Sequence, residues 1–171
     1  MKLKVVSNIS KYVGVIHLCG MIIENIYGFL FAKHVLCDKL YAVSFVFIPF
    51  SWVVCKDECI ISYLIKKYEN PHYILGTEPE NVNDITDLFP SRIAYELFYH
   101  TNHALRIASV IIVNNRTTRV SYFICIPTFL LYSFYIYDIT YRFDYRKIMS
   151  PHFQIIFCMY LLSMVYNIYR S

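Results

Sequence analysis

The feature that most constrains the fold is a series of apolar segments, each long enough to cross a lipid bilayer. The first, YVGVIHLCGMIIENIYGFLFA at residues 12–32, has 21 residues. At about 1.5 Å of helix rise per residue, such a segment crosses a hydrocarbon layer of about 30 Å. Charged residues make up 16% of the chain, well below the roughly 25% that is usual in soluble domains. The sequence therefore predicts an integral membrane protein.

Four further segments have the same character, and the five together predict an all-α helical bundle that forms a single membrane domain. A short polar stretch, residues 33–39, separates the first two segments, so these are expected to form a helical hairpin. The third segment carries several ionisable residues, and the prediction becomes four spanning helices if it does not cross. The predicted spanning segments are residues 12–32, 40–55, 93–113, 120–137 and 152–169.

The distribution of lysine and arginine predicts which side of the membrane each loop faces, because cytoplasmic loops carry an excess of these residues. With the N-terminus in the cytoplasm, ten of them fall on the cytoplasmic side and five on the other. The N-terminus is therefore expected to be cytoplasmic. The cytoplasmic set is Lys2, Lys4, Lys11, Lys56, Lys66, Lys67, Arg92, Arg142, Arg146 and Lys147, and the opposite set is Lys33, Lys39, Arg116, Arg119 and Arg170.

The longest water-soluble stretch is the loop at residues 68–91, whose central part is acidic. Its charge offers a binding place for a soluble basic protein partner, although a simply solvated loop is the favoured interpretation. The net charge of +4 has no basic run behind it, so no nucleic-acid partner is expected. The lipid bilayer is the expected partner, and assembly into a homo-oligomer is left as an open alternative. The acidic residues at the centre of the loop are Glu78, Glu80, Asp84 and Asp87.

The six cysteines are scattered and lack the dense spacing of a disulfide framework, so most are expected to be small buried apolar residues. Cys55 and Cys59 lie one helical turn apart, which leaves a redox pair or half of a metal site as a less favoured alternative. Asp57, Glu58 and Ser62 place acids and a hydroxyl near Cys59, but the sequence places no base there. A solvated helix end is the favoured interpretation of this stretch.

Ionisable residues inside the apolar segments are the main candidates for function, because a membrane interior makes them costly. In the first segment His17 and Glu24 are seven residues apart and therefore share one helix face. This face is expected to point into the bundle, with Glu24 protonated or paired with a cation. The same face carries Gly14, Met21, Gly28 and Phe31.

The third segment, RIAYELFYHTNHALRIASVIIV, has a polar stripe along one face, and three interpretations of it compete. In the favoured one its side chains form hydrogen bonds with Glu24, His17 and tyrosine hydroxyls and so fix the register of the helices. In the second they line a proton pathway or a polar pocket for a lipid or solute. In the third they hold iron or zinc, as facing carboxylate and histidine side chains do in helical bundles. The ionisable residues of the stripe are Glu96, His100, His103 and Arg106.

The stretch IPFSWVVCKDECIISYLIKKYENPHYILG, residues 48–76, resembles a group of small multi-pass membrane proteins of the nucleocytoplasmic large DNA viruses, the giant viruses. The resemblance covers about the first 76 residues and brings no established activity and no catalytic residue. It implies a viral protein of the virion's internal membrane or of host membranes during assembly. The features that carry it are His17, the CDKLY turn at 37–41, Trp52, the stretch from Glu58 to Tyr63, Lys66-Lys67 and Asn70-Pro71-x-Tyr73-x-x-Gly76.

Because the sequence contains no complete catalytic set, it favours a structural or assembly role in a membrane, with no cofactor. The first alternative is a polar-lined bundle that binds or transports a small ligand, lipid or proton. The second is a membrane metalloenzyme that uses Glu96, His100 and His103. Both alternatives depend on whether the first and third segments touch. The residues proposed to line the polar cavity of the first alternative are Glu24, His17, Glu96, His100 and His103.

Overall fold

The computed structural model describes residues 8–79 and 83–171, and every regular element in these ranges is a helix. The all-α prediction is therefore confirmed for the described chain. The long helices are α1 (Asn8–Leu30), α2 (Val35–Val54), α5 (Arg92–Val113), α6 (Tyr122–Tyr141) and α8 (His152–Arg170). Shorter elements are α3 (Ile60–Glu69), α4 (Asn83–Thr86), the π-helical turn η1 (Asn114–Thr118) and α7 (Tyr145–Ile148). Three of the charged residues considered above, Lys2, Lys4 and Glu80, lie outside the described residues.

Four described helices are long and apolar enough to cross a membrane: Lys11–Leu30 of α1, together with α2, α6 and α8. The helix α5 has 22 residues, but it carries Arg92, Glu96 and Arg106 and is not among the four. The fold is therefore a helical bundle that is compatible with a membrane location and has four candidate spans.

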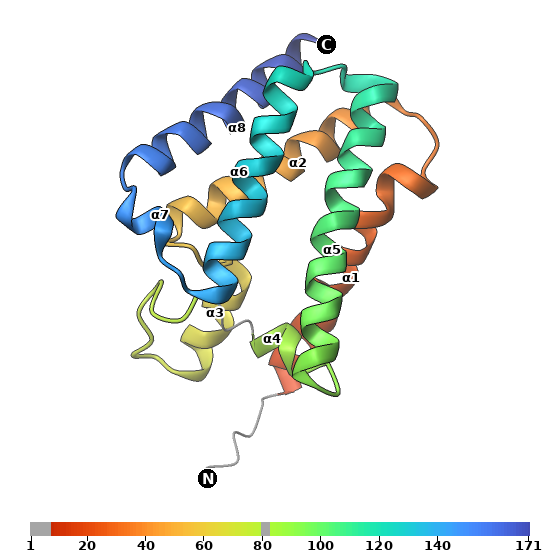
Figure 1. Ribbon diagram of the computed structural model, residues 1–171. Coiled ribbons are helices and arrows are strands. Elements are labelled where there is room, and N and C mark those ends of the chain that lie inside the picture. The colour runs from red at the N-terminus through yellow and green to blue at the C-terminus, as the bar shows by residue number, and fades with distance from the viewer. Residues whose placement is uncertain (1–7, 80–82) are drawn as a thin grey trace.

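The long helices run alternately up and down through the bundle (Figure 1). α1 and α5 lie side by side and run in the same direction, while α2, α6 and α8 form a second group. This second group encloses most of the core. Phe45 of α2 packs against Phe129 and Tyr132 of α6, and Tyr135 of α6 packs against Phe157 of α8. All five rings are buried.

Glycine allows α1 and α5 to approach closely. The amide nitrogen of Gly28 donates to Ser109 Oγ at 2.7 Å, and a Cβ atom at position 28 would lie 2.4 Å from the Ser109 carbonyl oxygen. A larger residue therefore fits only if one helix moves. Elsewhere along the pair, Asn25 and Asn102 share a hydrogen bond. Small residues at helix crossings are typical of membrane bundles, and Gly28 lies on the face of α1 that the sequence predicts to point inward.

The prediction of a loop at residues 33–39 is wrong, because α2 covers most of this stretch. His34 caps the helix: its Nδ1 accepts a hydrogen bond from the Cys37 amide at 3.3 Å, which satisfies one of the free amides of the first turn. Asp38 stands in the same turn, where a carboxylate faces the positive end of the helix dipole. The connection shrinks to residues 31–34. Away from it, α1 packs mainly on α5, and α2 packs mainly on α8.

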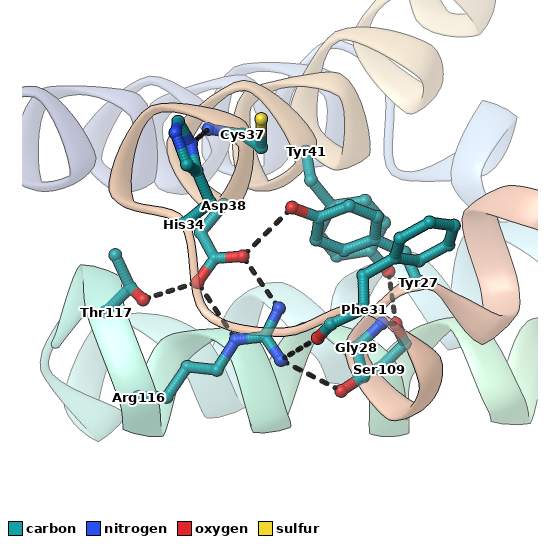
Figure 2. Close-up of polar contacts among 10 residues, drawn as sticks. All are labelled: Tyr27, Gly28, Phe31, His34, Cys37, Asp38, Tyr41, Ser109, Arg116 and Thr117. Atoms are coloured by element: carbon teal, nitrogen blue, oxygen red, sulfur yellow. Dashed lines mark hydrogen bonds and ion pairs between the residues drawn. The ribbon is translucent and has the colours of Figure 1, made fainter.

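Asp38 is the centre of a buried polar cluster at this end of the bundle (Figure 2). Its carboxylate accepts hydrogen bonds from Arg116 Nε at 2.9 Å and Arg116 Nη2 at 2.7 Å. The hydroxyls of Tyr27 and Thr117 donate to the same carboxylate. Arg116 Nη1 donates to two carbonyl oxygens at the end of α1, which have no partner within the helix. The cluster therefore ties the end of α5, through η1, to the turn between α1 and α2.

A second buried cluster surrounds Arg146 of α7. Its Nη1 donates to Asp138 of α6 at 2.9 Å, and its Nη2 donates to Asp57, in the connection between α2 and α3, at 2.6 Å. The Tyr135 hydroxyl donates to the same Asp57 carboxylate at 2.9 Å. The side chains of Arg146 and Asp138 are 3% and 0% exposed. One guanidinium therefore joins three separate parts of the chain.

The interpretation of Asp57, Glu58 and Ser62 as a solvated helix end is wrong. Glu58 and Ser62 are buried. Glu58 accepts hydrogen bonds from Lys66 Nζ at 2.5 Å and from the Gly76 amide at 2.8 Å. Gly76 has a φ of +83°, a backbone conformation that residues with a Cβ atom rarely adopt. These bonds fold the start of the acidic loop back onto α3, so the acids of this stretch serve as internal partners.

The expectation that most cysteines are buried is also wrong. All six are free thiols, and of these only Cys125 is buried. Cys19 and Cys37 are exposed on α1 and α2, beside exposed apolar side chains such as Ile23 and Leu36. Small apolar residues on such outward faces are expected where the covering medium is lipid rather than protein.

Candidate functional site

A half-open cavity of about 630 Å³ lies between α1, α2, α5 and α6 and reaches the first turn of α3. This volume falls within the roughly 300–1,000 Å³ that is typical of small-molecule sites. Its wall is mainly apolar, with contributions from several helices, and polar side chains enter it at a few positions. Apolar wall residues include Ile16 and Met21 of α1, Ile48 and Trp52 of α2, and Ile136 of α6. The ionisable wall residues that matter below are His17, Glu24, Asp57, Cys59, His103 and Arg106.

One ion pair joins α1 to α5 in the cavity wall. Arg106 Nη2 lies 2.7 Å from Glu24 Oε1, with the two side chains 5% and 16% exposed. The Ser44 hydroxyl donates to the same Glu24 oxygen at 3.3 Å, and the Arg106 guanidinium lies over the Phe45 ring. A buried charge is costly when it has no partner. The pairing therefore explains how α5 carries an arginine in the interior of the bundle.

His103 lies one turn before Arg106 on α5 and also faces the interior. Its Nδ1 is 2.5 Å from the Tyr132 hydroxyl, and its ring packs edge-on against Tyr99. His103 Nε2 and Arg106 Nε are buried and have no hydrogen-bond partner within the described part of the chain. An unsatisfied buried polar group costs about 1–3 kcal/mol. Other side chains cover both nitrogens, so a polar group of a ligand can pair with them only if these side chains move.

The five residues that the sequence predicts to line a polar cavity do not all lie together in the structure. Glu96 pairs with Arg92 Nε at 2.8 Å on the surface, and His100 Nε2 lies 3.1 Å from the Tyr141 hydroxyl. Neither belongs to the cavity wall. Among the residues that the structure describes, no three His, Cys, Asp or Glu side chains are grouped closely enough to hold a metal ion. The candidates that do line the cavity are His17, Glu24 and His103.

His17 has a partner of which the sequence gives no sign. Its Nε2 lies 3.9 Å from Sγ of Cys59, the residue that precedes the first turn of α3. The sequence places no base near Cys59 because this base belongs to another helix. Burial alone raises the pKa of the Cys59 thiol, but the hydrogen bond with His17 and the backbone amides of Ser62 and Ile61 lower this pKa below its ordinary value. Such surroundings are typical of reactive rather than structural cysteines.

The described part of the acidic loop is held against the rest of the protein. Lys66 Nζ donates to the Glu78 carbonyl oxygen at 2.6 Å, and α4 contacts α1. The side chain of Asp84 lies outside the described residues, as Glu80 does. The expected soluble partner of this loop stays a prediction.

No protein-family model, no curated protein and no solved structure matches this chain. The resemblance to giant-virus membrane proteins therefore stays a prediction. The function has to be inferred from the cavity and its chemistry.

Proposed function

We propose that the protein is a multi-pass membrane protein whose half-open cavity binds a ligand with one long acyl chain. The observation that carries this proposal is the cavity of about 630 Å³, which is apolar over most of its wall and polar where Glu24, His103 and Arg106 meet. Apolar walls accept hydrocarbon, and each CH₂ group removed from water contributes about 0.8 kcal/mol. The polar part of the wall fixes the other end of the ligand.

The charges in the wall favour an uncharged polar group on the ligand. Glu24 neutralises Arg106 at 2.7 Å, so this wall offers little net charge to a carboxylate or phosphate. The unpaired nitrogens of His103 and Arg106 instead suit a carbonyl or hydroxyl oxygen. A monoacylglycerol or another acyl ester has this combination of groups.

The same proposal includes α5 as a fifth spanning helix beside α1. At its C-terminal end, Arg116 of η1 binds Asp38 in the first turn of α2. Toward its N-terminal end, His100 contacts Tyr141, the last residue of α6. These contacts support a helix that runs the full height of the bundle, and Glu24 compensates the charge at its centre. With the N-terminus cytoplasmic, five spans place the C-terminus on the opposite side of the membrane.

Native mass spectrometry of the purified protein with monooleoylglycerol tests ligand binding. Gly20 lines the cavity, and a Cβ atom there meets no atom within 4 Å. Gly20→Leu therefore fills the cavity without a clash at its Cβ atom. We expect about one bound lipid per wild-type chain and an occupancy at least tenfold lower in Gly20→Leu. Cys19→Leu is the matched control, because Cys19 is exposed and lies outside the cavity wall; it should bind like the wild type.

Equal occupancy in the three proteins would place the lipid on the outer surface and overturn the proposal. The same holds if none of them retains the lipid. In either case the structural or assembly role that the composition favours becomes the better account. Until that test, the structural role stays a prediction.

A further inference from the structure

The cavity wall brings together a thiol and an imidazole that the ligand-binding proposal does not use. Cys59 lies at the start of α3 and His17 lies in α1, and both line the cavity. Cys59 Sγ and His17 Nε2 are 3.9 Å apart, which is within hydrogen-bond distance for a sulfur donor. Both side chains are half-buried, so a molecule inside the cavity can contact them.

The surroundings of Cys59 favour its thiolate form. It immediately precedes α3, a helix of ten residues, whose N-terminal amides carry partial positive charge. The imidazole of His17 supplies a proton acceptor from a second helix. Activation of a thiol by an adjacent base is the usual requirement for a nucleophilic cysteine. Helix position and base therefore point to the same chemistry.

The neighbours of this pair suit an acyl substrate. Ile60 and Ile61, directly after Cys59, and Ile16, directly before His17, belong to the same apolar wall. A long-chain acyl thioester has two groups that fit here. Its hydrocarbon chain packs against the apolar wall, and its electrophilic carbonyl carbon reacts with the thiolate. A simple hydrocarbon offers only the first of these groups.

We propose that Cys59 accepts a long-chain acyl group from an acyl thioester bound in the cavity, an inference that rests on the proposed function because it uses the same cavity. His17 Nε2 takes the proton of the thiol, and the thiolate attacks the carbonyl carbon. The bond from that carbon to the leaving sulfur breaks, and the leaving thiolate takes the proton from the imidazolium. The products are S-acylated Cys59 and a free thiol, so the step consumes no oxidant, metal or water.

Incubation of the purified full chain with alkyne-tagged palmitoyl-coenzyme A tests this step. We expect a label on the peptide that contains Cys59, released by neutral hydroxylamine as a thioester is. Cys59→Ala should remove the label, and Cys55→Ala should retain it, because Cys55 lies at the end of α2 and outside the cavity wall. The exposed Cys19 and Cys37 are internal controls in the same sample. Equal labelling of these two cysteines would overturn the proposal.

A second variant separates the role of His17 as a base from a structural one. His17→Asn should slow acylation of Cys59 at least tenfold, and it should also slow alkylation of Cys59 by iodoacetamide. Its circular dichroism spectrum and its unfolding midpoint in sodium dodecyl sulfate should match those of the wild type, which reports an intact fold. Unchanged acylation and alkylation rates in His17→Asn would overturn the assignment of His17.

The two proposals fail in different ways. If monooleoylglycerol binds in the cavity but Cys59 is never labelled, the acylation proposal is overturned and the ligand-binding proposal stands. If Cys59 is labelled selectively, and Gly20→Leu changes neither the labelling nor lipid occupancy, the reaction stands and the ligand-binding cavity is overturned.

Discussion

Replacing Arg146 by leucine is expected to lower the free energy of unfolding by about 3–5 kcal/mol, the usual loss when a buried ion pair is deprived of one partner. The guanidinium lies between Asp138 at 2.9 Å and Asp57 at 2.6 Å. Leucine leaves both carboxylates without their cation. The Asp138 side chain is fully buried, so water cannot take the place of the lost partner. Titration with sodium dodecyl sulfate, followed by circular dichroism in mixed micelles, measures the loss.

Lys147→Leu is the matched control for Arg146→Leu. Lys147 is adjacent in the same short helix, and its ion pair with Asp144 is exposed on both sides, so its removal should change stability little. Arg146→Lys should fall between wild type and leucine, because one ammonium group lacks the planar fork that reaches two carboxylates at once. Equal stability of the Arg146→Leu and Lys147→Leu proteins would contradict the role of Arg146 as the buried partner of the two carboxylates.

Replacing Asp38 by alanine is expected to have an effect of similar size, about 3–5 kcal/mol. The fully buried carboxylate accepts two hydrogen bonds from Arg116 and one from the hydroxyl of Tyr27. Alanine leaves the guanidinium beside the end of α1 with no counter-charge. The end of α5 then loses its tie to α2. The same detergent titration measures this loss.

Two further variants define the origin of the Asp38 effect. Glu96→Gln removes a carboxylate from the exposed pair with Arg92 and should cost no more than about 0.5 kcal/mol. In the double variant Asp38→Ala, Arg116→Leu no unpaired charge remains, so it should recover part of the lost stability. A double variant that is less stable than Asp38→Ala alone would show that packing, rather than charge, holds this end.

Helix positions could be predicted from the sequence because apolar periodicity and length set them locally. The sequence predicts the fifth segment at residues 152–169, and the helix covers 152–170. It predicts the third at 93–113, and the helix covers 92–113. The inward face of α1 could also be predicted in part, since Gly28 sets the close approach to α5. The start of α2 inside the predicted loop at 33–39 could not be predicted, because its cap is His34, a residue type not usually taken as a helix cap.

The partners of the polar residues could not be predicted, because they depend on packing between distant segments. Asp57 and Arg146 are 89 positions apart, and Cys59 and His17 are 42 positions apart. A composition-based interpretation treats Asp57 as a solvated charge, whereas the fold gives it a buried cation. Likewise the sequence groups Glu96 with His103 on one face of α5. The fold separates them. The part of this face near the N-terminal end of α5, with Glu96, lies at the surface, whereas His103 is buried.

The mean hydropathy of α5 is likewise calculated without regard to the partners of its polar residues. Summed over the helix, Arg106 counts as a full charge against membrane insertion. In the bundle its partner is Glu24 of the parallel helix α1, and the two side chains are only 5% and 16% exposed.

We propose that α5 crosses the membrane beside α1, since without this crossing the Glu24–Arg106 pair and the cavity would not lie within the bilayer. Glycosylation of acceptor tags appended to either end of the chain, in separate proteins translated into microsomes, tests it most directly. Five spans place the ends on opposite sides, so we expect the C-terminal tag to be glycosylated and the N-terminal tag to stay unmodified. Glycosylation of both tags, or of neither, would indicate an even number of spans and contradict the claim.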